Sequence, residues 1–490
     1  MKQLPFLATT VIFLACTRDQ PSKLGNVNFP TSASGEVQAH FLRGVAALHS
    51  FWYEEALDEF RQATKIDPNF AMGYWGEAMA HNHPIRGDPQ NTEAARQALA
   101  KIGDTARLTE RERVYINAVG ILYGPGDKPA RDQAYAEAME KLYREYPEDP
   151  EAASLYALAL LGSAHHGEGA VRQRMQAAAI AQEVFRKNPN HPGAAHYVIH
   201  AFDDPDHAIL GLPAAKRYAE IAPEAYHARH MPSHIFLQLG MWPEAAASNE
   251  SAWAASVKMT EERHLPINRR DYHSLHWLLY ICLQQGRYDE AREQLELMRT
   301  SLAQFDKQDK FRLLFGTFTY SSMAAADIVE TERWDAAKPV EADQGMLRVA
   351  QSPLIFAQGM AAAARGLPAG DSIAALKAMR ELPVGLPEAL SNLPKIVEIQ
   401  AMEIAAVSAA AKGGYDEAVE IVKKAVAIEQ SMPPPSGPPM VIKPAHELLG
   451  EVLLQAGRPA EAAQQFEISL ARHPNRARSV QGLARARKRP

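Results

Sequence analysis

A pattern that returns every 34 residues restricts this chain to a narrow set of folds. From residue 37 onward, runs rich in Ala and Leu with helical periodicity alternate with short breaks that contain Gly, Pro or Asn. Segment 37–70 carries the small, aromatic and helix-ending positions of the pattern at Gly44, Ala56, Phe60, Ala63 and Pro68. A repeat of this length forms one helical hairpin, which buries its apolar face only against a neighbouring copy. The sequence therefore predicts an all-α chain of stacked helical hairpins.

Further copies follow the same frame of a turn glycine and a small residue in the second helix. They begin near residues 226, 272, 399 and 443, and weaker copies fill 113–225. These segments resemble the tetratricopeptide repeat family, which implies a right-handed solenoid of tetratricopeptide-like helical hairpins over residues 37–490. Within it we expect a histidine-rich region at about 160–280, a Pro-rich loop at 432–439, and a C-terminal repeat with its cap at 443–490.

The first 16 residues carry the features of an export signal. One Lys precedes an apolar run from Leu4 to Ala15, which is too short to span a bilayer, and Cys16 follows. Segment 1–16 resembles a bacterial lipoprotein signal peptide. The resemblance implies lipidation of Cys16 and an extracytoplasmic lipoprotein, anchored on the periplasmic side of a bacterial membrane; an ordinary cleaved secretory signal is the alternative. Residues 17–36 are polar and aperiodic, which predicts a flexible tether.

The composition excludes several classes of function. With 52 Lys+Arg, 58 Asp+Glu and no long basic run, nothing in the chain favours nucleic-acid binding. The two cysteines cannot form a disulfide framework or a Cys-rich zinc site. The sequence contains no Gly-rich phosphate loop, no Gly-x-Ser-x-Gly elbow and no His-Glu-x-x-His motif. Any metal would therefore depend on nitrogen and oxygen ligands.

Histidines cluster in the middle of the chain at the period of the repeat. Twelve of the 18 lie within 165–276. The pair His196 and His200 returns 34 residues later as His230 and His234. Equivalent positions of adjacent repeats stack side by side in a solenoid, and residues four apart share one helix face. We therefore expect these imidazoles on one surface, and the family resemblance identifies that surface as the concave groove where ligands bind.

Three interpretations of the histidines stay open: a metal site, a metal-free groove for an anionic ligand, and structural histidines. For the metal site, a divalent ion such as Zn, Fe, Ni or Cu is expected on His196, His200, His230 and His234. Further metal or groove positions are His166, His227, His273, His276, Tyr280, Asp203, Asp204 and Asp271. His49 and His83, also 34 residues apart, are expected on the same surface nearer the amino end.

The predicted function is binding of a divalent metal, a ligand or both in the histidine-lined groove. One alternative is a metal-dependent enzyme, hydrolytic or oxidative, that uses the same histidines with Asp203, Asp204 or Asp271 nearby. The other is a metal-free scaffold that holds an unknown protein or peptide partner.

Overall fold

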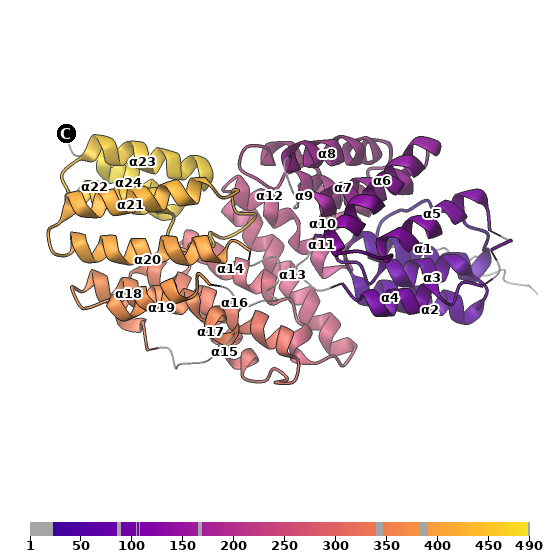
Figure 1. The fold of residues 1–490 in the computed structure, drawn as a ribbon, viewed down its shortest axis with the longest axis horizontal. Coiled ribbons are helices and arrows are strands. Elements are labelled where there is room, and N and C mark those ends of the chain that lie inside the picture. The colour runs from indigo at the N-terminus through magenta and orange to yellow at the C-terminus, as the bar shows by residue number, and fades with distance from the viewer. Residues whose placement is uncertain are drawn as a thin grey trace, which may run out of the picture.

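The computed structural model describes residues 23–85, 90–103, 105–106, 108–164, 169–339, 346–381 and 391–488. Every regular element within these ranges is a helix. Figure 1 shows the helices stacked along one long axis, with α1–α5 near one end and α18–α24 at the other. The prediction of an all-α solenoid of helical hairpins is confirmed. The predicted signal segment 1–16, with Cys16, lies outside the described residues.

The N-terminal half holds α1 (Gly35–His49), α2 (Tyr53–Ile66), α3 (Ala71–Met79), α4 (Thr92–Leu99), α5 (Glu110–Leu122), α6 (Lys128–Glu145), α7 (Pro150–Ser163), α8 (Ala170–Lys187), α9 (Pro192–Ala201), α10 (Ala208–Ile221), α11 (Tyr226–His230) and α12 (Pro232–Gln238). The C-terminal half holds α13 (Trp242–Glu262), η1 (Ile267–Arg269), α14 (Tyr272–Gln284), α15 (Tyr288–Leu302), α16 (Lys310–Thr331), η2 (Trp334–Ala336), α17 (Met346–Ala350), α18 (Ser352–Ala364), α19 (Gly370–Ala378), α20 (Leu393–Ala410), α21 (Tyr415–Gln430), α22 (Ala445–Gln455), α23 (Pro459–Arg472) and α24 (Ala477–Lys488). Among these helices, none combines the length and apolar character needed to cross a membrane.

The hairpins follow the predicted repeat. In α1 and α2, a Cβ atom added at Gly44 would lie 2.7 Å from Cε1 of the Phe60 ring, so this crossing of the two helices requires glycine. The C-terminal hairpin repeats the arrangement, with 2.8 Å between such a Cβ at Gly450 and Cζ of Phe466. The copies expected from 226, 272, 399 and 443 are the hairpins α11–α13, α14–α15, α20–α21 and α22–α23.

Residues 23–34 differ from the predicted flexible tether, because they pack against the first repeats. Leu24 and Phe29 are fully buried. The Phe29 ring lies 5.2 Å from that of Phe41 and 4.7 Å from that of Tyr115, between ring centroids. Burial of these two apolar side chains against the folded repeats stabilises the packed position of an otherwise polar segment.

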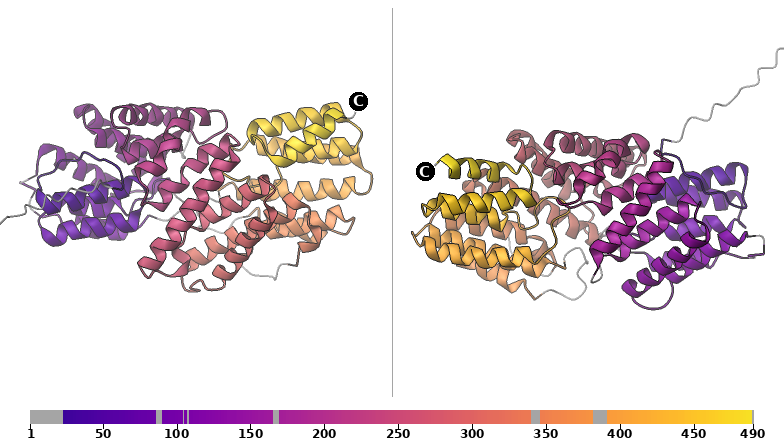
Figure 2. Two further views of the ribbon diagram at one scale, coloured as in Figure 1. Left: turned by 180° about the vertical axis from the view of Figure 1, so that it is seen from behind. Right: turned by 90° about the horizontal axis from the view of Figure 1, so that it is seen from above.

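The last repeat turns back onto the middle of the chain, as two further views of the fold show (Figure 2). Arg476, fully buried before α24, donates from Nε to Glu447 Oε2 at 2.8 Å and from Nη1 to the Tyr280 hydroxyl at 3.1 Å. It also pairs with Glu330 of α16 at 2.5 Å. These ion pairs in a dry environment connect α24 and α22 to the middle helices.

The Pro-rich loop 432–439 lies against the middle of the chain as well. The Gln238 side chain donates to the Pro435 carbonyl at 2.8 Å. A Cβ atom added at Gly437 would lie only 2.4 Å from Cζ2 of Trp277, so the loop backbone rests directly on that indole. The loop therefore reaches the part of α14 that carries the histidines.

Candidate metal centre

Six histidines of the predicted surface gather into two groups of three. The first triad consists of His196, His200 and His227, and the second triad consists of His230, His234 and His273. Within each triad, one potential ligand atom from every residue lies within 4.8 Å of the other two. We call the six residues together the histidine cluster.

Each triad joins two neighbouring repeats in the same way. The first triad takes an i, i+4 pair from α9 and its third imidazole, His227, from the start of α11. The second triad takes its i, i+4 pair from α11 and α12 and its third imidazole, His273, from the start of α14. The pair in α11 and α12 spans Pro232, yet the backbone stays helical at Met231 and keeps both side chains on one face.

The metal set expected from the sequence is therefore divided. The sequence predicts that both i, i+4 pairs bind a single ion. In the structure, each pair instead lies close to a third imidazole from the next repeat. The shortest approaches lie within the triads: His196 Nε2 is 3.2 Å from His227 Nε2, and His230 Nε2 is 3.1 Å from His234 Nε2. Across the triads, the ring centroids of His200 and His234 are 5.9 Å apart. The pair His196 and His200 and the pair His230 and His234 lie on adjacent repeats, and the step from one repeat to the next separates them.

Hydrogen bonds determine the tautomers in the second triad. His234 Nδ1 lies 2.6 Å from Asp203 Oδ2, and a carboxylate at this distance accepts the Nδ1 proton. His230 Nδ1 lies 2.7 Å from Asn249 Oδ1. The Asn249 amide is oriented by its Nδ2 group, which donates to the Ala245 carbonyl at 2.8 Å, so its oxygen faces the imidazole. Each Nδ1 therefore carries a proton, and the two Nε2 atoms face each other at 3.1 Å.

The first triad is oriented by the N-terminal repeat. His196 Nδ1 donates to the backbone carbonyl of His49 at 2.7 Å, which leaves the lone pair of its Nε2 directed at His227. Phe51 covers this triad with ring centroids 4.4 Å from His196 and 5.5 Å from His227. Phe51 occupies the left-handed region at φ 52°, a conformation that only the surrounding packing can hold.

The histidine cluster is mostly dry. His196 and His230 are fully buried, and His227 and His234 are 8% exposed. His200 and His273 are partly exposed, one in each triad. Trp277 lies against the second triad, with its ring centroid 4.4 Å from His234 and 4.9 Å from His230. Low polarity around the rings strengthens any interaction between them and an ion.

Three acidic candidates have other roles. Asp203 accepts from His234 Nδ1 and thereby orients that imidazole. Asp204 accepts from the backbone and from Nδ1 of His207 and pairs with Arg174, so it organises the turn before α10. Asp271 caps α14 through the amide of Ser274 at 3.4 Å. Their part in a metal site or groove stays a prediction.

The remaining candidates lie outside the triads. His276 lines a small pocket with Tyr280, Phe318 and Pro438, and burial lowers its pKa to about 4, which keeps the ring neutral at pH 7. The Tyr280 hydroxyl accepts from Arg476, and burial raises its pKa. His166 lies outside the described residues.

His49 and His83 do not share the predicted surface with the triads. His49 forms a fully buried network with Glu151 at 2.7 Å, and His191 Nε2 is 3.2 Å from the same carboxylate. His191 Nδ1 accepts from the Ala194 amide, so its Nε2 carries the proton that Glu151 accepts. The network thereby connects α1 and α7 to the start of α9. His83 packs on Tyr53, with ring centroids 4.3 Å apart.

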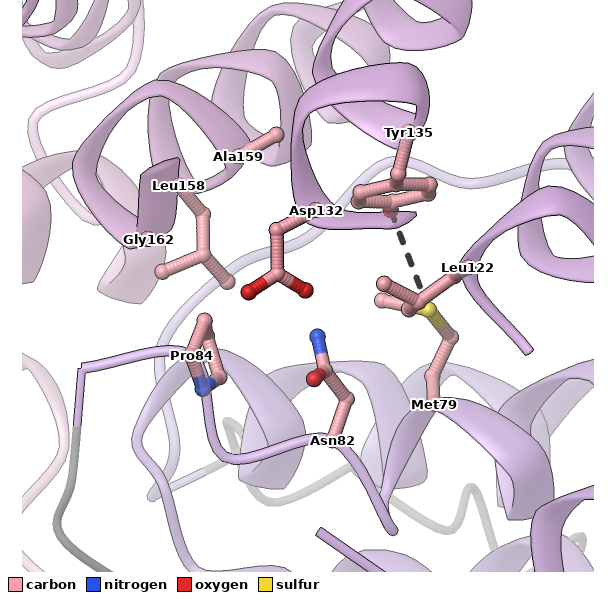
Figure 3. Close-up of a pocket in the computed structure, with 9 residues that line it drawn as sticks. All are labelled: Met79, Asn82, Pro84, Leu122, Asp132, Tyr135, Leu158, Ala159 and Gly162. Atoms are coloured by element: carbon pink, nitrogen blue, oxygen red, sulfur yellow. Dashed lines mark hydrogen bonds between the residues drawn. The ribbon is translucent and has the colours of Figure 1, made fainter. Parts of the chain in front are cut away.

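A pocket near the N-terminal end shares no residue with the histidine cluster. It is lined by Met79, Asn82, Pro84, Leu122, Asp132, Tyr135, Leu158, Ala159 and Gly162 (Figure 3). The Asp132 carboxylate and the Asn82 amide point toward each other, and the Tyr135 hydroxyl donates to Met79 Sδ at 3.8 Å. Asp132 already forms an ion pair with Lys128, so this pocket is a weaker candidate for a metal or ligand site than the triads.

The arrangement of the histidine cluster suits a transition-metal ion. Three imidazoles occupy three positions of a tetrahedral ion and leave the fourth open, as in catalytic rather than structural zinc sites. Partners on Nδ1 that set the tautomer of the ligating ring are typical of metal-binding histidines. The approach of Nε2 atoms to 3.2 and 3.1 Å agrees with the separation of about 3.3 Å between two nitrogens bound at 2.0–2.1 Å in tetrahedral geometry.

Comparisons with known proteins bear on the repeat. The model of the tetratricopeptide repeat family matches residues 37–70. No curated protein matches the chain. Three solved structures are similar to it: yeast Tom70 (11% identity, 92% of this chain and 88% of that chain covered, TM-score 0.35), the human IFIT1 dimer with m7Gppp-AAAA (15%, 93% and 82%, 0.37), and the APC/C hetero-tetramer Cut9-Hcn1 (12%, 93% and 97%, 0.30).

The similarity to the tetratricopeptide repeat family lies in the matched repeat and in the hairpins that continue it. The first repeat, α1 and α2, coincides with the matched residues 37–70. The later hairpins repeat its small and aromatic positions, as at Gly450 and Phe466. Repeats of this kind point to a scaffold that binds protein partners. This chain therefore carries a tetratricopeptide repeat at residues 37–70, within a solenoid of similar helical hairpins.

Proposed function

We propose that this tetratricopeptide repeat protein binds a divalent transition metal in its histidine cluster. The observation that carries the proposal is the pair His230 and His234. Both rings donate from Nδ1, to Asn249 and Asp203, and their Nε2 atoms are 3.1 Å apart. Two lone pairs at this distance, in a nearly dry site, require a cation between them.

A metal ion satisfies that requirement better than a proton. A proton bridges only two nitrogens, whereas the second triad places three imidazoles within reach of one ion. A divalent ion uses all three rings. The first triad supports the same proposal, since its three imidazoles also lie close enough to share one ion.

The ligand set restricts the metal. Neutral imidazoles suit Zn, Cu, Ni and Fe, whereas Mg and Ca prefer oxygen ligands. The described cysteine, Cys282, is buried, and burial raises the pKa of its thiol, so thiolate ligation at this site has no support. The open fourth position would let the ion bind a ligand of a partner or a substrate in the predicted groove.

Metal content of the full chain, prepared without an affinity His-tag, tests the proposal. We expect at least one equivalent of Zn, Cu, Ni or Fe by plasma mass spectrometry, and a reduced content in His230→Ala/His234→Ala. A matched control removes two histidines elsewhere: His40→Ala/His446→Ala, in α1 and α22. Circular dichroism establishes that the variants fold. Metal-free protein, even after reconstitution with each of these ions, or equal metal in both variants, would refute the proposal.

We also propose export and anchoring of the chain through a lipid on Cys16, on the basis of the signal pattern in residues 1–16. Expression in a bacterial host should give a membrane-associated form that labels with fatty acid. A Cys16→Ser variant should lose the label. A labelled Cys16→Ser variant, or an unlabelled parent, would contradict lipidation.

A further inference from the structure

We infer that the histidine cluster holds two metal ions side by side, one in each triad, and that the ion pair binds a small oxyanion such as a carboxylate or phosphate. This inference rests on the proposed metal binding and deepens it: it gives the number of ions and the chemical class of the ligand.

The positions of the close contacts favour two ions over one. The two shortest nitrogen separations, 3.2 Å and 3.1 Å, belong to different triads. Each of them by itself matches two ligands of one ion. An ion held by His230 and His234 has its third ligand in His273 and needs no residue of the first triad. The same reasoning applies to the first triad with His200.

The two centres are neighbours. Two pairs of rings face each other across the triads, with centroid separations of 5.9 Å for His200 and His234 and 6.1 Å for His227 and His230. The triads are thus in contact through their ligands, as expected for equivalent positions on adjacent repeats. Ions in both triads would therefore be close enough for one small ligand to interact with each.

The charges favour an anion at the open positions. An imidazole that binds a metal ion contributes no charge, and two divalent ions would contribute four positive charges. Asp203 beside His234, and Asp271 two residues before His273, contribute two negative charges. Excess positive charge in a largely buried site is costly unless a bound anion compensates it. Carboxylates and phosphates offer two oxygens, one for each ion.

The access route is consistent with a small ligand. Each triad has one partly exposed member, His200 in the first and His273 in the second. The other four rings are at most 8% exposed. An incoming ligand would therefore reach both ions past these two imidazoles, while the remaining rings hold the ions from the buried side.

Metal stoichiometry in the full chain tests the number of ions. After loading with Zn²⁺ and removal of excess, we expect two equivalents in the parent. His200→Gln/His227→Gln and His234→Gln/His273→Gln should each keep one. With Cu²⁺, the parent should give an electron paramagnetic resonance spectrum of two coupled ions, and each variant the spectrum of an isolated ion. One equivalent in the parent would overturn the pair yet leave metal binding intact, and none would overturn both.

Should a double variant fail to fold by circular dichroism, single His200→Gln and His273→Gln variants at the partly exposed positions replace it. Each should then bind its ion at least tenfold more weakly, as expected for loss of a ligand. Equal loss of both ions in either single variant would mean one shared site and would contradict the pair.

Calorimetric titration with acetate and with inorganic phosphate tests the ligand class. Both anions should bind the two-ion protein, with the tighter one identifying the preferred oxyanion. Binding should weaken at least tenfold in the variants that keep one ion, and vanish in metal-free protein. Absence of binding to the two-ion protein, or equal binding to the metal-free protein, would overturn the oxyanion proposal without affecting the ion count.

Discussion

The two triads share one sequence pattern and differ in what surrounds them. Each consists of an i, i+4 pair and a histidine from the next repeat. His196 of the first triad donates to a backbone carbonyl, whereas His234 of the second donates to the carboxylate of Asp203. A carboxylate partner makes the ligating imidazole more basic than a carbonyl does. The orienting partners therefore differ between the triads, and we expect the second triad to bind a metal ion more tightly.

The aromatic neighbours differ as well. Phe51, from the loop between α1 and α2, covers the first triad, and Trp277 of α14 covers the second. Trp277 also supports the Pro-rich loop at Gly437. The first triad therefore depends on the N-terminal repeat, while the second is coupled to the C-terminal repeats. Four substitutions test this division, from the largest expected effect to the smallest.

Phe51→Ala should disturb the first triad most. The ring is 1% exposed and lies against two ligands, so its removal should lower the free energy of unfolding by about 3–5 kcal/mol. Metal titration of the folded variant should show weaker binding at the first triad. Urea unfolding measures the stability change. Weakening at the second triad alone would contradict the division.

Asp203→Asn should weaken metal binding at the second triad about 10–100-fold, as expected for loss of an orienting carboxylate. The first triad should keep its affinity, because its Nδ1 partner is the His49 carbonyl. Competition with a chelator measures both affinities. Asp206→Asn, at an exposed position of the same turn, is the matched control and should change neither. An equal effect on both triads would refute the predicted asymmetry.

Gly437→Ala should affect the second triad through the loop. The added Cβ would meet the Trp277 ring at 2.4 Å, so the loop or the indole must shift, at a cost of about 1 kcal/mol in the free energy of unfolding. A modest change in metal affinity should follow at the second triad only. Gly103→Ala, with no atom within 4 Å of the added Cβ, serves as the control. No change in either quantity would mean that the loop is independent of the site.

The substitution with the smallest expected effect on metal binding tests the pH dependence of stability near the second triad. The pKa of His276 is lowered to about 4 by burial, below the ordinary value of about 6.5, so the unfolded chain binds more protons between these values. The free energy of unfolding of the metal-free protein should therefore fall as the pH drops from about 6.5 to 4. His276→Gln should make this decline shallower, as urea unfolding at several pH values can measure. If His276→Gln left the slope of the free energy of unfolding against pH unchanged, the lowered pKa of His276 would be refuted.

The repeat was predictable because its signals are local. Gly44 and Phe60 lie within one 34-residue copy, and their contact is repeated at Gly450 and Phe466. The prediction of a flexible tether is wrong for residues 23–34, because Phe29 packs not only on Phe41 but also on Tyr115, which lies far along the chain. The polar composition of this segment does not indicate that Leu24 and Phe29 become buried against the repeats.

The sequence by itself determined the helical hairpins, their stacking and the common face of His196, His200, His230 and His234, because a 34-residue period and a 3.6-residue turn are properties of the chain. Only the tertiary structure decided which imidazoles form a triad and which atoms orient them. His227 and His273 complete the triads from the next repeat, and the partners on Nδ1, such as Asp203 and Asn249, come from other helices or turns. Such contacts depend on how repeats pack and bend, and no spacing along the chain encodes that geometry.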